Sequence, residues 1–430
     1  MLQLIFNCKK ELLSITIAHL SLVLLFYLVG YCEIKPESID LRGYSAFSSD
    51  SFACHDQALQ LKTLLENEEF SEWWEFRSRF HTRVASVAYF VWGKLTGYNI
   101  LALWPINCLL LLMSWTAWKY LIFQLGGRLS SKLLVWLAFP ILLVHFTQLL
   151  RDPYYIAFFL MWLNAWIFLF KTSDDKSYYK AFIVILLISP FLYWVRDRFW
   201  ILAQLMSVFC FGFGICLFIA KKKNFLFIKI LMLLFLSLNS YSIYKMVMRV
   251  IAPEQMQSEK VGIAVDKPFV FFYKVAFLRK NFIKSYDQVS GLDKHIQFNS
   301  DADVIAYIPR AIQIGLFMPF PNMWFEYEGK TGVLGKLLSA WEMVLMWFVM
   351  ALVFYKLIVN KVNVETTLCL VIILISTLAL GLVVTNGGAL YRMRLSSWLV
   401  WGALCYALCF PALAQNNGIK LEVPNKKTGE

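Results

Sequence analysis

Apolar runs of about 20 residues recur along the chain, separated by short connections that are mostly basic. A helix of that length crosses the hydrocarbon core of a bilayer, so each run predicts a membrane span. Of the 430 residues, 59% are hydrophobic, far more than a soluble protein of this size carries. We therefore predict an all-α, polytopic transmembrane helical bundle with about ten spans. In chain order these are 12–31, 100–123, 133–149, 154–170, 181–194, 199–220, 225–248, 334–357, 366–384 and 395–414.

Two long polar segments interrupt this pattern, and they divide the chain into three parts. Residues 1–250 form a transmembrane core that includes the first polar segment, 32–98. Residues 251–333 form a second polar segment, and residues 334–430 hold the last spans and a basic tail. Within the first segment, residues 84–95 are apolar and aromatic but too short to span, which predicts a helix lying at the membrane surface.

The formal net charge of +13 comes largely from Lys and Arg in the short connections. That distribution follows the positive-inside bias of membrane proteins and argues against a nucleic-acid partner. An alternating count places both termini in the cytoplasm and both long polar segments outside. Short loops favour a bacterial inner membrane, with the outer segments facing the periplasm.

Several arginines lie on the predicted outer side, against that bias. They occur in three short turns: Arg151-Asp152-Pro153, Arg196-Asp197-Arg198 and Tyr391-Arg392-Met393-Arg394. A guanidinium group stays charged and offers a fork of donors that suits phosphate. One such turn could be a local ion pair, worth about 0–1 kcal/mol at a surface. Three turns on one face favour a shared anion-binding site.

The first polar segment supplies a candidate carboxylate, Asp50, which follows two serines at the start of a helical pattern. Asp in this position is most often a helix cap. His55 and Asp56 follow within two turns and are possible accessory groups. Cys32 and Cys54 could form a disulfide in an oxidising compartment, although spacing alone fixes no pairing. The sequence has no metal-ligand spacing, phosphate-binding loop or nucleophile-elbow motif.

Taken in order, these motifs resemble the GT-C superfamily of glycosyltransferases that use polyprenyl-phosphate sugars. Protein O-mannosyltransferases and lipid A aminoarabinose transferases belong to this superfamily. The resemblance covers roughly the first half of the chain and the final span. In the long outer segment and the second span, it rests on an early acidic residue, Asp50, a surface helix at 84–95 and a polar start to the span, Gly97-Tyr98-Asn99. Further along, it rests on an Arg-Asp turn, Arg151-Asp152 with Pro140 before it, and on Arg196 after the fifth span. The last part is the Arg-rich motif Tyr391-Arg392-Met393-Arg394 at the final span.

The resemblance implies transfer of a sugar from a polyprenyl monophosphate to a hydroxyl group of a glycan, lipid or protein. Asp50 would be the general base, and Asp152 would orient an arginine or the acceptor. Arg392 and Arg394, with Arg196 or Arg151, would bind the donor phosphate. No cofactor is implied with certainty, and a divalent cation stays open. Ser51 follows Asp50 where the O-mannosyltransferases have a tandem Asp-Glu, which weakens the inference of a protein acceptor.

Two other classes fit a chain with many spans. An O-antigen polymerase or ligase also has outer arginines and a large outer segment, but it uses lipid-diphosphate donors. A lipid or sugar transporter usually has internal repeats and ionisable groups at mid-membrane. No clear repeat is present, and Lys119 and Glu342 lie towards span ends. The segment 251–333 matches no general motif of the family, and it is equally a candidate for acceptor recognition and for a capping segment packed on the membrane.

Overall fold

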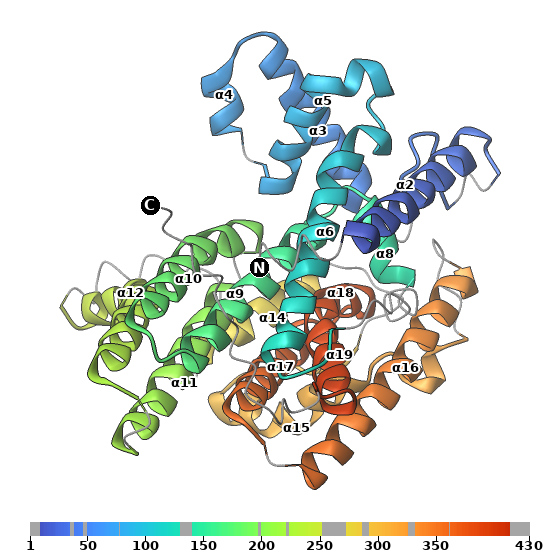
Figure 1. Ribbon diagram of the computed structural model, residues 1–430. Coiled ribbons are helices and arrows are strands. Elements are labelled where there is room, and N and C mark those ends of the chain that lie inside the picture. The colour runs from blue at the N-terminus through green and yellow to red at the C-terminus, as the bar shows by residue number, and fades with distance from the viewer. Residues whose placement is uncertain are drawn as a thin grey trace, which may run out of the picture.

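The described part of the chain is helical, as the hydrophobic pattern predicts (Figure 1). The computed structural model describes residues 9–34, 38–45, 50–76, 78–129, 140–196, 199–220, 223–251, 272–285, 292–325, 332–360 and 362–412. Within these ranges the extended structure is limited to two isolated β-bridges. The prediction of an all-α fold is confirmed.

Seven helices of the described residues are long and apolar enough to cross a membrane. They identify an integral membrane protein, but they do not confirm the expected ten spans. These seven are α2 (Lys9–Tyr31), α6 (Ile100–Gln124), α9 (Asp152–Lys171), α10 (Asp175–Val195), α11 (Phe199–Ile219), α16 (Gly332–Val359) and α17 (Val364–Val383).

The three remaining expected spans differ from the pattern for separate reasons. Helix α8 is described only over Pro140–Thr147, because much of the expected span 133–149 lies outside the described residues. Helix α12 (Phe225–Ile251) contributes a shorter apolar stretch, Phe225–Ser240. Helix α19 (Leu395–Cys409) has 15 residues and is too short to count.

Helix boundaries follow local capping chemistry. Asn99 starts α6 by accepting a hydrogen bond from the Leu101 amide at 2.8 Å. Gly97, with φ of +81°, ends the preceding helix in the left-handed conformation that glycine adopts most easily. The polar start expected for the second span is therefore a helix C-cap followed by a helix N-cap.

The first polar segment folds into three helices that stand together at one end of the molecule (Figure 1). These are α3 (Asp50–Glu66), α4 (Phe70–Glu75) and α5 (Phe80–Thr96). Helix α5 contains the expected surface helix 84–95. Small side chains such as Ala58, Ala85 and Ala88 let α3 and α5 pack closely, in a core shared with Val23 of α2 and Ile100 of α6.

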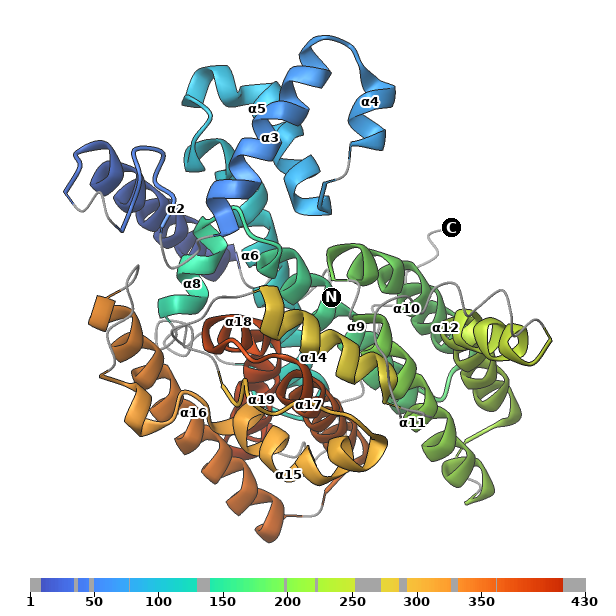
Figure 2. The same ribbon diagram turned by 180° about the vertical axis from the view of Figure 1, so that it is seen from behind.

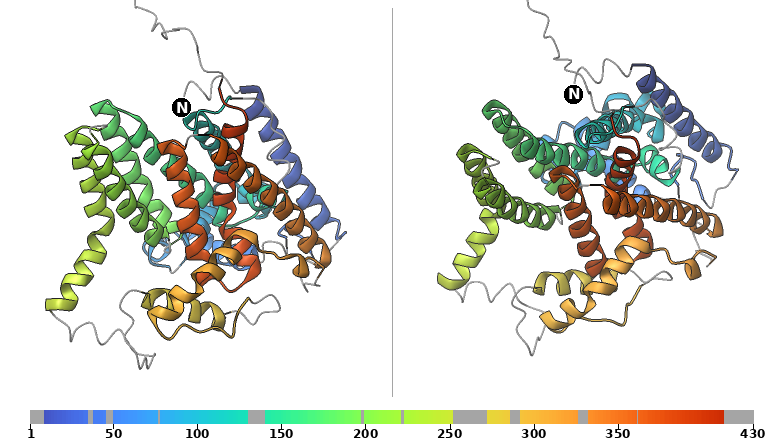
Figure 3. Two further views of the ribbon diagram at one scale, coloured as in Figure 1. Left: turned by 90° about the horizontal axis from the view of Figure 1, so that it is seen from below. Right: turned by 60° about the horizontal axis from the view of Figure 1, so that its bottom comes forward.

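The second polar segment packs on the C-terminal helices rather than standing apart. Its helices α14 (Tyr273–Ser285) and α15 (Asp301–Phe317) lie at one end of the bundle (Figure 3, left). Side chains of α14 and α15 share a core with α17 and with the short helix α18 (Gly387–Met393). A Cβ atom on Gly381 of α17 would lie 1.9 Å from the Ala311 carbonyl oxygen of α15, so only glycine allows this approach. The two helices are therefore in contact backbone to backbone.

Candidate active site

Asp50 and Arg392 form an ion pair although 342 positions separate them in the sequence. Asp50 is the first residue of α3, where the helix N-terminus favours a negative charge. Arg392 lies in the last turn of α18, and its Nη2 is 3.1 Å from Asp50 Oδ2. In Figure 2, α3 lies above α8 and α18. The Asp50 side chain is 38% exposed, so its carboxylate is open to a ligand from outside.

A second carboxylate, Asp152, forms an ion pair with Arg196. Asp152 begins α9, directly before a proline in the first helical turn, and Arg196 follows the last residue of α10. The guanidinium of Arg196 also lies over the ring of Tyr155, 4.5 Å from its centroid. This pair is far more buried than the Asp50 pair, with side-chain exposures of 4% and 11%.

Arg151 and Arg79 add positive charge that the described side chains do not neutralise. Burial, together with repulsion from Arg196, Arg79 and Arg392, outweighs the attraction of Asp152 and lowers the pKa of Arg151 to about 10. Within the described residues, no side chain accepts a hydrogen bond from Arg151 or Arg79. The four arginines and two carboxylates therefore leave an excess of two positive charges in one neighbourhood.

A neutral histidine lies beside this charged group. Burial, together with the positive charges of Arg151 and Arg79, lowers the pKa of His81 to about 3. His81 Nε2 is 3.3 Å from the sulfur of Cys54, which lies one helical turn after Asp50. His81 therefore carries no charge at neutral pH, and it packs under the site rather than contributing another cation.

Arg79 and His81 belong to this neighbourhood, although no motif in the sequence points to them. Both lie at the start of α5, where Arg79 precedes the first helical residue. The sequence signal for them is the start of a helical pattern at Phe80, which predicts a helix N-terminus within the first polar segment.

Arg394 does not join the site, contrary to the role expected for it in phosphate binding. Its side chain is 2% exposed and lies 4.6 Å from the ring centroid of Trp398. It donates hydrogen bonds to the backbone oxygens of Gly315, at 3.2 Å, and of Met318. Arg394 therefore fixes the end of α15, and Arg392 alone represents this motif at the site.

His55 and Asp56 also lie away from Asp50. His55 is 1% exposed, and its Nδ1 is 2.9 Å from the Tyr89 hydroxyl, which in turn contacts Tyr44. Asp56 pairs instead with Arg42, at 3.3 Å. These two residues belong to the opposite face of α3, so the structure gives no support to an accessory role for them.

The cysteines and carboxylates form no linked or metal-binding group in the part of the chain that the structure describes. Cys32 is exposed, Cys54 is buried, and both are free thiols. No set of three or more His, Cys, Asp or Glu side chains among the described residues could hold a metal ion. Asp50 and Asp152 are each held by an arginine instead.

Comparisons with known proteins identify no relative for this chain. No protein-family model matches the sequence, and neither the curated proteins nor the solved structures yield a significant match. The fold and the geometry of the charged site are therefore the basis for assigning a function.

Proposed function

We propose that this protein is a membrane glycosyltransferase that moves a sugar from a polyprenyl-phosphate donor to a hydroxyl acceptor. Asp50 is the general base, and Arg79, Arg151, Arg196 and Arg392 surround the donor phosphate. Asp152 positions Arg196 through their buried ion pair. The reaction takes place at the outer face of the membrane, and the superfamily that the motifs resemble is GT-C.

The observation that carries this proposal is the ion pair between Asp50 and Arg392. It joins the early acidic residue to the late arginine motif, as the resemblance requires. The same neighbourhood contains Arg151, whose electrostatic environment includes Arg392, Arg196 and Asp152. A buried structural ion pair would leave no surplus charge, whereas the described residues of this site include two more cations than anions.

The charge balance of the reaction suits that surplus. A polyprenyl-phosphate sugar is a phosphodiester with one negative charge. When the bond between the anomeric carbon and the phosphate oxygen breaks, the leaving polyprenyl phosphate gains a second negative charge. Guanidinium groups aimed at that charge stabilise the transition state more than the ground state. No proton is needed on the leaving group.

Asp50 has to be released from Arg392 before it can act as a base. An incoming phosphate competes for the Arg392 guanidinium, because that group binds phosphate and carboxylate with the same fork of donors. The freed carboxylate then accepts the proton of the acceptor hydroxyl while the acceptor oxygen bonds to the anomeric carbon, with inversion. The ion pair thus links donor binding to activation of the base.

The test is sugar transfer by the purified full-length protein in vesicles, using polyprenyl-monophosphate sugars as donors. Asp50→Asn should lower the transfer rate by about 10²–10⁴-fold, the usual contribution of a general base. Asp56→Asn, six residues further along the same helix, is the matched control and should leave the rate unchanged. Full activity in Asp50→Asn would remove Asp50 from the mechanism.

The choice of donor separates this proposal from its nearest rival. Transfer from lipid-diphosphate donors alone would replace the proposed reaction with that of an O-antigen polymerase or ligase. Movement of the lipid across the vesicle membrane without sugar transfer would instead indicate a transporter.

A further inference from the structure

A small pocket lies at the far end of α6 from the candidate active site. Helix α6 begins at Ile100, whose amide bonds the Arg42 carbonyl of the first polar segment. At 1.5 Å per residue, Lys119 is about 28 Å further along the same helix. The pocket is lined by side chains of α6, of the turn after α6 and of α19, among them Trp115, Trp118, Lys119, Arg128 and Tyr406.

Basic groups gather at this end of the bundle. Lys171, at the end of α9, donates a hydrogen bond to the Gln124 carbonyl oxygen at the end of α6, at 2.8 Å. Lys223 reaches the Thr172 carbonyl oxygen at 2.5 Å. By the positive-inside bias, such an end faces the cytoplasm, where the leaflet contains anionic lipids.

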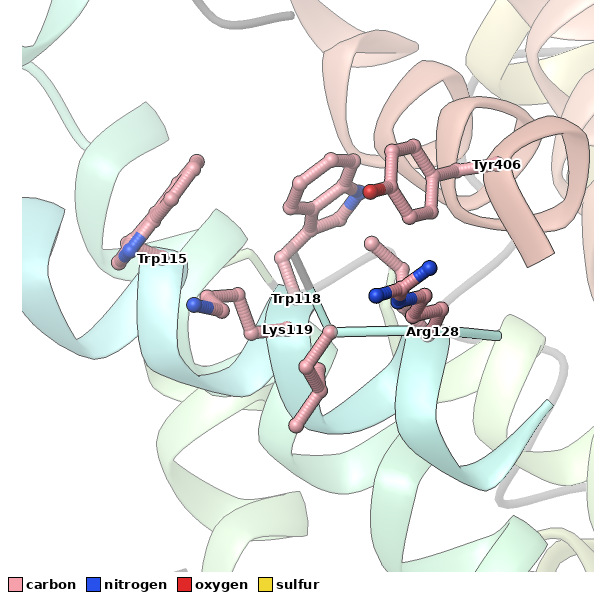
Figure 4. Close-up of a pocket in the computed structure, with 7 residues that line it drawn as sticks. Trp115, Trp118, Lys119, Arg128 and Tyr406 are labelled. Atoms are coloured by element: carbon pink, nitrogen blue, oxygen red, sulfur yellow. The ribbon is translucent and has the colours of Figure 1, made fainter. Parts of the chain in front are cut away.

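The pocket combines aromatic walls with a net charge of one. In Figure 4, Lys119 extends beside Trp115, Arg128 lies below Tyr406, and Trp118 stands between the two cations. Lys119 is paired with Glu11 of α2 at 2.8 Å, so it offers hydrogen bonding without net charge. Arg128 is exposed, and no described side chain accepts a hydrogen bond from its guanidinium. One unmatched cation complements the single negative charge of a phosphodiester.

The backbone holds Arg128 in place at the mouth of the pocket. Gly126, with φ of +82°, turns the chain at the end of α6. A Cβ atom on Gly127 would lie 2.9 Å from Ala407 Cα, so the turn lies directly against α19. The Arg128 amide then donates to the Phe410 carbonyl oxygen at 2.8 Å. The backbone at Arg128 is therefore anchored at the mouth of the pocket, and its exposed side chain extends from this fixed point.

We propose that this pocket binds the phosphodiester headgroup of an anionic phospholipid. The pocket is small and open, so only phosphate oxygens enter its mouth beside Arg128, while the rest of the headgroup and the acyl chains stay outside it in the bilayer. Arg128 donates to the phosphate oxygens, and the indole and phenol rings lie at the headgroup level that such rings favour. This site is separate from the proposed glycosyl transfer and does not depend on it.

The test measures lipid binding by the purified full-length protein in detergent, followed as a shift in melting temperature. Phosphatidylglycerol, phosphatidylcholine and inorganic phosphate are titrated separately. Phosphatidylglycerol should stabilise the wild-type protein well above phosphatidylcholine, and inorganic phosphate at equal concentration should not. Arg128→Gln should weaken the apparent affinity for phosphatidylglycerol by about fivefold, the effect of one basic residue at an anionic surface.

Two further variants control for folding and for non-specific charge. Arg128→Lys keeps the charge and should restore affinity to within about twofold of the wild type. Lys176→Gln removes an exposed cation from the first turn of α10 and should leave the affinity unchanged. An equal loss of phosphatidylglycerol affinity in Lys176→Gln and Arg128→Gln would overturn the proposal that the lipid binds in this pocket. Equal stabilisation by inorganic phosphate would overturn the assignment to a lipid.

Discussion

Arginines at one end of this molecule occupy two very different environments. In the second polar segment, Arg279 is 2% exposed, and its guanidinium is saturated by acceptors. It donates to the backbone oxygens of Ile296, Leu382 and Asp293 at 3.2, 3.1 and 3.0 Å. At the candidate active site, no described side chain accepts a hydrogen bond from Arg151, and the other arginines there outnumber the carboxylates.

The carboxylates of the two regions differ in the same way. Asp293 accepts from the Tyr307 hydroxyl at 2.7 Å and from Arg310 at 3.0 Å, and these bonds outweigh burial to lower its pKa. Asp50 has one arginine and open access to solvent. Saturated charges hold backbone segments together, whereas surplus charges are available to a ligand. This difference in hydrogen bonding separates charged residues that stabilise the fold from charged residues that can bind a ligand.

The largest effect should come from Arg394, which is buried like Arg279 and likewise donates hydrogen bonds to backbone oxygens. Arg394→Leu should lower the free energy of unfolding by about 3–5 kcal/mol, because Arg394 is attracted to the buried carboxylate of Glu342 and bonds two carbonyl groups, and all three would lose their cation. Melting temperature in detergent and yield from membranes measure this loss. Arg392→Leu is the matched control, and a similar melting temperature in both variants would place Arg394 outside the scaffold.

A smaller effect, on binding rather than folding, is expected for Arg392. Arg392→Gln should weaken binding of polyprenyl phosphate by about 10–100-fold, the value of a charge-assisted hydrogen bond. The melting temperature should change little, since a partly exposed ion pair contributes about 0–1 kcal/mol. Binding of radiolabelled polyprenyl phosphate to the reconstituted protein measures the first quantity. Unchanged binding would move the phosphate away from α18.

Acid should destabilise the first polar segment through its buried histidines. Burial lowers the pKa of His55 to about 4, and burial with two arginines lowers the pKa of His81 to about 3. In the unfolded chain both titrate near 6.5, so the unfolded state takes up more protons below that pH and folding weakens as pH falls. From pH 6.5 to 5 we expect a loss of about 1–2 kcal/mol per histidine.

Melting temperature across this pH range tests the effect. A His55→Gln/His81→Gln double variant should show a flatter profile than the wild type. An equally steep profile in the double variant would mean that other groups cause the acid sensitivity.

The smallest effect should come from a partly exposed arginine of the second polar segment, Arg310. Arg310 is partly exposed and pairs with Asp293, so Arg310→Gln should cost no more than about 1 kcal/mol. Differential scanning fluorimetry against the wild type measures the change. A loss as large as that of Arg394→Leu would mean that exposure does not separate the two kinds of arginine.

Helix length and charge distribution predicted much of the fold from the sequence. Seven apolar runs became helices long enough to span, and residues 84–95 fell inside α5. The expected span 395–414 ends early, because α19 stops at Cys409. Hydropathy reports how apolar a run is, but it does not report where the helix ends.

Helical geometry explains which site residues the sequence could identify. Asp50 and Arg392 meet as expected, but Arg392 and Arg394 are two positions apart and point about 200° apart around a helical turn. They could not both have faced one phosphate. On α3, His55 is five residues after Asp50 and lies on another face, whereas Cys54, one turn on, lies on the same face. Helical geometry therefore identifies Cys54, rather than His55, as the residue that shares a face of α3 with Asp50.

The placement of two arginines at the end of α18 has a consequence for how the protein responds to its substrates. Arg392 lies in the last turn of this seven-residue helix, and Arg394 is its C-cap residue. Arg394 donates to the Gly315 carbonyl oxygen near the end of α15, and Arg392 pairs with Asp50. Two neighbouring side chains therefore connect the second polar segment to the proposed base, and we expect a ligand that displaces α15 to change the Asp50–Arg392 contact.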